Sequence, residues 1–205
     1  RSIRGAHMLT CNSKTLSLLI ASIWLTAPYT ANAQDPDAML LQQCSMCHGQ
    51  DGNSSTPGAP SFGGISETYF RYTLDAYKNK GRESDMMKML VDGLSAEQID
   101  QLTSYYAKQK YKPADQPFDA ALAAEGKILH DQYCAKCHEN EGRPSPNSYG
   151  ILAGQWMPYL QLTLKEYREG KRRVNPMMVT KLKHVEAQAG EKGFEQLVHY
   201  YASVK

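Results

Sequence analysis

Apolar side chains along this chain recur at helical spacing, and no useful length of it alternates with period two. In residues 66–80 they stand three or four positions apart, which is the spacing of the buried face of a helix. Similar patterns predict further helices over residues 38–47, 95–108, 120–137, 156–169 and 194–203. We therefore expect an all-α fold with almost no sheet.

Local signals mark the ends of these helices. Ser95 and Gln98 open one predicted helix at the spacing of a capping box, in which each side chain bonds the other residue's backbone. Gly81 and Gly170 each follow a predicted helix, where a left-handed glycine commonly ends it. Segments rich in Gly, Pro, Ser and Asn predict loops over residues 49–64 and 139–154.

The chain repeats itself. Cys44 and Cys134 are 90 residues apart, and a Met-Met pair recurs at an offset of 91. The offset of 90 also pairs Gly64 with Gly154, Tyr69 with Tyr159 and Tyr77 with Tyr167. Such a period predicts a duplicated domain, with short insertions in the second copy. We expect the copies over residues 34–112 and 119–205, joined by an extended linker over residues 113–118.

The first 33 residues are typical of segments that mature proteins lack. Residues 1–7 resemble an expression scar, and residues 8–33 predict a cleaved secretory signal, because a positive start and an apolar run precede Ala31-Asn32-Ala33. That signal predicts a periplasmic location. The apolar run is too short to span a bilayer, so we expect no stable membrane span. An uncleaved anchor helix is the alternative.

The net charge of the chain depends on whether residues 1–33 are counted. The whole chain has 23 basic and 21 acidic residues, and residues 1–33 contain three of the basic ones and no acidic one. The remainder is therefore nearly neutral, at 20 basic against 21 acidic residues. This balance shows no excess of basic residues, so the composition does not indicate nucleic acid as a partner.

The candidate chemistry lies in one pentapeptide that occurs twice. Both copies have the pattern Cys-x-x-Cys-His, in which the thiols attach to the vinyl groups of a c-type haem and the histidine binds its iron. The residues are Cys44, Cys47 and His48, then Cys134, Cys137 and His138. Zinc knuckles usually place their Cys pairs 15–20 residues apart in one small domain, and a redox Cys-x-x-Cys needs a strand–helix context. Two covalently bound haem c groups are therefore expected.

A sixth iron ligand must come from downstream, and methionine is a usual partner of histidine in such proteins. We predict Met87 and Met178, which hold the second position of matching Met-Met pairs in loop-like stretches. Met86, Met89 and Met177 stay open as alternatives. His130 is expected to be a surface or satisfied residue rather than a ligand. Aromatic side chains are expected to pack in the haem pockets and between the domains: Tyr69, Trp156 and Tyr159.

With these residues in view, residues 38–205 resemble the dihaem class I cytochromes c of the c4 type. The resemblance rests on Cys44-x-x-Cys47-His48-Gly49-x-Asp51-Gly52-Asn53-Ser54, on Met87, on Asp92-Gly93-Leu94-Ser95 and on their second-copy counterparts. Within that group the chain looks most like the cytochrome subunit of flavocytochrome c sulfide dehydrogenase. That likeness rests on residues 66–70, 129–131, 151–160 and 181–182.

The resemblance implies two tandem class I haem domains with His48/Met87 and His138/Met178 ligation. It also implies that the Pro60 carbonyl accepts a hydrogen bond from the His48 ring. The second copy has Gly150 at that position, which leaves the acceptor for His138 open, with a carbonyl near Pro146 as one candidate.

The resemblance further implies an electron-transfer subunit, not catalytic alone, in a heterodimer with an FAD-containing flavoprotein subunit that oxidises sulfide. Electrons would leave for a soluble acceptor cytochrome. The alternative is a free-standing c4-type carrier to a terminal oxidase. A dihaem peroxidase is disfavoured, because it needs an open position on one iron and both copies keep a methionine.

Overall fold

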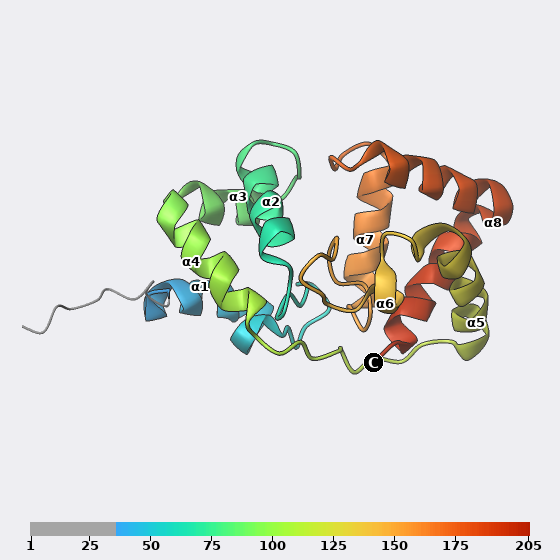
Figure 1. Cartoon of the computed structure of the whole chain (residues 1–205), viewed down its shortest axis with the longest axis horizontal. Helices are drawn as coiled ribbons and strands as arrows, with labels where there is room; N and C mark the ends of the chain where they lie inside the picture. Colours follow the sequence, from blue (N-terminus) through green and yellow to red (C-terminus); the bar gives the residue numbers. More distant parts are fainter. Residues whose placement is uncertain (1–35) are drawn as a thin grey trace, which may run out of the picture. The chain divides into compact units, whose positions relative to one another are not determined.

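The computed structural model describes residues 36–205, so the expected scar and signal over residues 1–33 lie outside the described part. The described residues are helical (Figure 1). Within them the extended pairing consists of one isolated antiparallel bridge, between Arg82 and Arg172. The predicted all-α fold is confirmed.

Four helices form the first half of the described chain. They are α1 (Ala38–His48), α2 (Glu67–Lys78), α3 (Asp85–Asp92) and α4 (Ala96–Ala107), with a 3₁₀ turn at Gln50–Gly52 after α1. The predicted capping box begins α4: the Gln98 amide nitrogen donates to Ser95 Oγ over 3.1 Å, and the Ser95 amide nitrogen donates to Gln98 Oε1 over 2.9 Å.

The second half follows the same order with two changes. Its helices are α5 (Ala120–Leu129), α6 (Glu139–Gly142), α7 (Met157–Arg168) and α8 (Pro176–Ser203). The predicted helix over residues 120–137 instead changes to a π-helical turn at His130–Cys134. Helix α8 begins 18 residues before the predicted 194, and it is interrupted at Gly190, whose φ is 61°.

The glycine prediction for the helix ends is right in one half only. Gly170, with φ 70°, takes the left-handed conformation after α7. After α2 the left-handed residue is Lys80, with φ 55°, and not Gly81. The offset of 90 residues pairs Lys80 with Gly170, so the left-handed residue holds the same position in both halves. In the first half the glycine lies one residue after that position.

Each half has its own hydrophobic core. In the first, Phe62 lies between Phe70 and Tyr106, with ring centroids 4.9 and 4.7 Å away. In the second, buried apolar side chains of α5, α7 and α8 meet around Val185 and Leu197. Two such cores fit a duplicated domain, because each copy then buries most of its own apolar face, while Ile151 of the second half packs in the first core.

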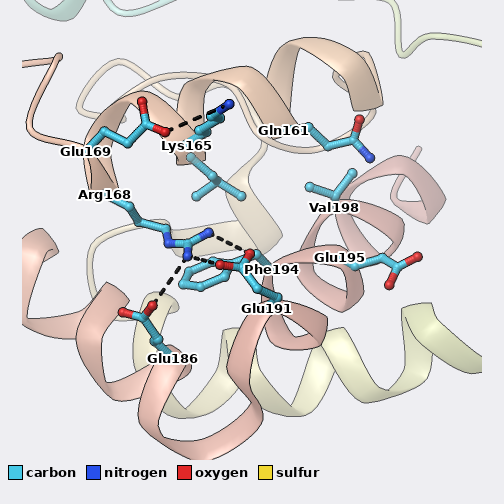
Figure 2. A pocket seen from close by; sticks show the side chains of 10 residues that line it. Gln161, Lys165, Arg168, Glu169, Glu186, Glu191, Phe194, Glu195 and Val198 are labelled. Atoms are coloured by element: carbon cyan, nitrogen blue, oxygen red, sulfur yellow. Dashed lines mark hydrogen bonds and ion pairs between the residues drawn. The ribbon is translucent and has the colours of Figure 1, made fainter.

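Ion pairs tie α7 to α8 at the surface of the second half. Arg168 lies with its guanidinium carbon 4.1 Å from the centroid of the Phe194 ring and contacts Glu186 and Glu191 (Figure 2). These side chains line a surface cavity of about 530 Å³. None of the cysteine, histidine, methionine or aromatic residues predicted for the functional site lines it.

The segment between the halves is extended and packs against the second half. The Ala114 amide donates to the Gly154 carbonyl over 2.8 Å, and the Tyr111 hydroxyl donates to the Ala153 carbonyl over 2.8 Å. Gly154 has φ 61°, and a Cβ there would lie 2.4 Å from Pro113 Cβ, so the close approach requires glycine. Among the described helices, none combines the length and apolarity that crossing a membrane requires.

Candidate haem sites

The first Cys-x-x-Cys-His motif occupies the C-terminal end of α1. Residues three and four apart share a helix face, so Cys44 lies beside both Cys47 and His48. Cys44 packs against the first core, Cys47 is exposed and His48 is buried. The helix therefore presents one inner thiol, one outer thiol and one buried imidazole to the same region.

The His48 ring is oriented by a backbone carbonyl. Its Nδ1 lies 2.8 Å from the Pro60 oxygen, and its ring centroid lies 4.6 Å from that of Phe62. A carbonyl only accepts, so Nδ1 carries the proton and Nε2 keeps its lone pair for a metal. Burial lowers the pKa of His48, the Pro60 bond opposes that effect, and the Arg82 charge lowers the pKa further. The neutral imidazole is the form that binds iron.

The second motif begins at the end of the π-helical turn. The His138 amide donates to the Cys134 carbonyl over 2.9 Å, which closes the last turn before the ligand. His138 Nδ1 is buried and has no hydrogen-bond partner in the described residues, so no carbonyl near Pro146 serves it. Burial, with a smaller contribution from the nearby His130, lowers the pKa of His138 to about 4.

The backbone of Gly150 explains why the second half has no counterpart of Pro60. Gly150 has φ 96°, and a Cβ at this position would lie 3.0 Å from the Tyr69 ring of the first half. Proline holds φ near −65° and is therefore excluded from this conformation. The backbone at position 150 thus accepts glycine and excludes proline, in agreement with the difference between the two copies.

The paired methionines differ in exposure in the way the ligand prediction requires. Met87 is half-buried against the first core, whereas Met86 and Met89 are 59% and 65% exposed. Met178 is half-buried against the second core, whereas Met177 is 63% exposed. The expectation of loop-like surroundings was wrong, since both inner methionines lie in the first turn of a helix, α3 or α8.

The predicted aromatic residues make crossed contacts between the halves. Arg82 of the first half donates to the Tyr159 hydroxyl over 3.1 Å, and Arg172 of the second half donates to the Tyr69 hydroxyl over 3.3 Å. Trp156 Nε1 donates to the Ser54 carbonyl over 3.1 Å. These tyrosines and the tryptophan therefore lie where the halves meet.

The two arginines were not among the residues that we predicted from the sequence. They are 8% and 6% exposed, and neither belongs to an ion pair among residues 36–205. Burial by itself raises the pKa of Tyr159, but the positive charges of Arg82 and Arg172 outweigh that effect and lower the pKa to about 8. The repeat could have found them, because each follows a repeated tyrosine, Tyr77 or Tyr167, by five residues.

His130 is satisfied, as expected, but it is not at the surface. Its side chain is 1% exposed, and Nδ1 lies 3.0 Å from the Tyr201 hydroxyl. The π-helical turn that begins at His130 brings it inward, where its ring lies 5.1 Å from that of Tyr200.

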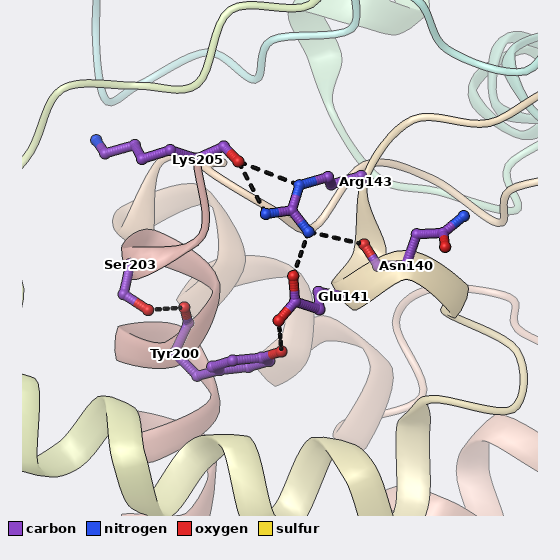
Figure 3. A network of polar contacts seen from close by, with 6 residues as sticks. All are labelled: Asn140, Glu141, Arg143, Tyr200, Ser203 and Lys205. Atoms are coloured by element: carbon purple, nitrogen blue, oxygen red, sulfur yellow. Dashed lines mark hydrogen bonds and ion pairs between the residues drawn. The ribbon is translucent and has the colours of Figure 1, made fainter.

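A polar network holds the loop that follows His138 (Figure 3). Arg143 donates to the Lys205 carbonyl over 2.9 Å and pairs with Glu141, which accepts from the Tyr200 hydroxyl. The same positions act in the first half, where Asn53 donates to the Lys110 carbonyl over 3.0 Å. In both halves the segment after the histidine is thus hydrogen-bonded to the residues that follow the last helix.

These residues fit a covalent haem in each half. Each half offers two thiols at the attachment spacing, an imidazole on the adjacent residue that is buried in the first half and half-buried in the second, and one thioether that faces the core while its neighbour faces solvent. In the first half the imidazole is already held in the tautomer that leaves Nε2 for iron.

Comparisons with known proteins point the same way, although no family model matches the chain. Cytochrome c4 of Pseudomonas aeruginosa is 33% identical over 175 residues, which cover 77% of this chain and 84% of that protein. The thiosulfate dehydrogenase electron acceptor of Thiomonas intermedia is 29% identical over 169 residues, which cover 77% of this chain and 76% of that protein. The cytochrome subunit of sulfide dehydrogenase of Chlorobaculum tepidum is 35% identical over 74 residues, or 36% of this chain and 66% of that subunit.

Among solved structures, reduced cytochrome c4 of Pseudomonas stutzeri superposes with a TM-score of 0.67 at 28% identity. The match covers 83% of this chain and all of that one.

Proposed function

Because the chain belongs to the cytochrome c4 family, we propose that it is a dihaem carrier that accepts electrons from a dehydrogenase of a reduced sulfur compound. Two covalently bound haem c groups are its cofactors. The observation that supports the proposal is the tandem arrangement itself, in which each half pairs a buried or half-buried histidine with a half-buried methionine after its Cys-x-x-Cys motif. We place the carrier in the periplasm, as the predicted secretory signal implies.

Each residue of the two sites has a definite part in this proposal. The four cysteines would hold the haems covalently, His48 and Met87 would bind the first iron, and His138 and Met178 the second. Bound haem supplies a one-electron couple. Since each iron would be bound by a histidine and a methionine of this chain, neither would be left free for a substrate, and the chain's own work would be to hold and bury the haems.

Arg82 and Arg172 are the cations best placed to meet the haem carboxylates. Burying a charge without a partner is costly, and these guanidiniums have no acidic partner among the described residues. Arg82 donates to the Tyr159 hydroxyl, and Arg172 donates to the hydroxyls of Thr163, Tyr69 and Tyr159, so each guanidinium keeps N–H donors for an anion. Haem propionates are anions of that kind.

Two relatives named for sulfur-compound dehydrogenases support such an enzyme as the electron donor, and their matched lengths differ. The thiosulfate dehydrogenase electron acceptor matches this chain across both halves, whereas the sulfide dehydrogenase subunit matches about a third of it. That shorter match supports a second candidate, a permanent subunit bound to an FAD-containing flavoprotein. In either case the outgoing electrons pass to an acceptor cytochrome.

Co-expression and kinetics separate the two candidates. The carrier proposal predicts that the purified chain elutes alone after co-expression with a sulfide-oxidising flavoprotein, and that thiosulfate dehydrogenase reduces both haems in the presence of thiosulfate. The near-neutral charge of residues 34–205 predicts a weak dependence of this rate on salt. A stable complex that retains flavin would support the second candidate instead.

Single methionine variants test the iron ligands. Replacing Met87 by alanine should lower the midpoint potential of one haem by at least about 59 mV, the equivalent of a tenfold shift, because a methionine ligand raises the potential. The far-red absorption of the methionine-bound ferric haem should fall by half. Met178→Ala should do the same to the other haem, and this pair of variants assigns the two potentials.

Met86→Ala and Met177→Ala are the matched controls, because both side chains are exposed neighbours of the predicted ligands. Neither should move a potential or the far-red absorption. The ligand assignment would fail if an exposed-methionine variant lost that absorption while its buried partner kept it.

A further inference from the structure

One side chain of the second half holds the backbone that orients His48. Gln155 is 2% exposed, and its amide makes two hydrogen bonds to Ser61 of the first half. The Ser61 amide donates to Gln155 Oε1 over 2.9 Å, and Gln155 Nε2 donates to the Ser61 carbonyl over 2.8 Å. Both backbone polar groups of one first-half residue are therefore satisfied by a single second-half side chain.

Ser61 follows Pro60 directly, and Pro60 provides the carbonyl that accepts from His48 Nδ1 over 2.8 Å. The Ser61 hydroxyl also accepts from the Ser54 amide over 2.9 Å. With both backbone groups of Ser61 held, the preceding peptide unit has little freedom to rotate, so the direction of the Pro60 carbonyl depends on Gln155.

The first half has no residue that supports His138 in the way that Gln155 supports His48. The first-half position that corresponds to Gln155 is Ile65, whose side chain has no amide group. The second-half position that corresponds to Pro60 is Gly150, and His138 Nδ1 has no partner among the described residues. The second half thus supports the histidine of the first half and receives no equivalent support.

We infer that Gln155 is a positioning residue through which the second half sets the reduction potential of the first haem. The inference rests on the iron ligands proposed above. A hydrogen bond from Nδ1 to a well-placed acceptor makes the imidazole a stronger donor to the metal. A stronger donor favours ferric over ferrous iron, so it lowers the potential. Loosening the Pro60 carbonyl should therefore raise the potential of the first haem and leave that of the second unchanged.

The test replaces Gln155 by methionine, which keeps the volume and removes the two hydrogen bonds to Ser61 together with the one that Oε1 accepts from the Trp156 backbone amide. We expect the midpoint of the first haem, as assigned by the Met87 and Met178 variants, to rise by about 59 mV, the equivalent of a tenfold shift. The second midpoint should stay where it is. Exchange of the His48 Nδ1 proton with solvent, followed by NMR, should become faster.

Two further variants keep the test decisive. Gln155→Asn keeps a neutral amide that is one methylene shorter, so it buries no charge and should fold even where methionine does not; it should shift the first midpoint less than methionine does, in the same direction. Gln98→Leu removes the capping amide of α4, in the same half as His48, and should destabilise the chain without moving either midpoint.

Unchanged midpoints in folded Gln155→Met, equal shifts of both haems, or an equal effect of Gln98→Leu would each overturn the inference. Failure of the proposed function would look different. It would show as haems of the unsubstituted chain that thiosulfate dehydrogenase does not reduce, whereas a wrong ligand assignment would show as missing methionine ligation in that chain.

Discussion

A chain in which Cys134 and Cys137 are both replaced by serine should carry one covalent haem instead of the two that its family binds. Serine cannot form the thioether bonds, and the haem then has only His138 and Met178 to hold it. The pyridine haemochrome assay of denatured, acid-acetone-extracted protein should give half the haem per chain. The second core should also become more accessible to protease, because the cofactor buries a large apolar area there.

Mirror and control variants complete the experiment. Serine at Cys44 and Cys47 should also leave one haem, in this case the second. Cys11 is the cysteine outside both motifs and lies among the residues that precede the described part, so Cys11→Ser should keep the full haem content. Full covalent haem content in either double variant would refute attachment at that motif.

Replacing Gly126 by valine should destabilise the protein more than any surface change. Gly126 lies in α5 against α8, and even a Cβ atom there would lie 2.0 Å from the Gln196 carbonyl oxygen and 2.8 Å from Tyr200 Cβ. Those are contacts with a helix backbone and with the root of a side chain, neither of which can swing away. We expect a loss of about 3 kcal/mol or more in the free energy of unfolding, a large share of a typical total.

Denaturant unfolding followed by far-ultraviolet circular dichroism measures this loss. Gly58→Ala is the matched control, because no atom lies within 4 Å of a Cβ placed there, and its effect should stay within about 0.5 kcal/mol. Equal unfolding midpoints for Gly126→Val and Gly58→Ala would show that α5 and α8 do not pack as described.

The elements with strong local signals were predictable from the sequence. The amphipathic pattern of residues 66–80, the capping box at Ser95 and the repeat of the Cys-x-x-Cys-His motif each depend on neighbouring residues, and the structure contains the corresponding helices. The repeat also selected Met87 and Met178, and the structure places these two against the cores and turns their neighbours outward.

The features that the sequence did not predict depend on contacts across the whole chain. No local pattern reveals that Gln155 reaches Ser61, 94 residues earlier, or that Arg82 meets Tyr159. The inward position of His130 follows from a π-helical turn, which a helical pattern of 3.6 residues per turn does not reveal. Local propensity also misplaced the start of α8, since packing against α5 and α7 extends that helix.

The left-handed backbone of Gly150 means that the halves are not interchangeable parts. A protein assembled from two copies of the first half would bring proline to this position, where φ is 96° and the Tyr69 ring lies alongside. Proline cannot adopt that angle. An engineer who replaces the second half by a copy of the first must therefore restore a glycine at this position.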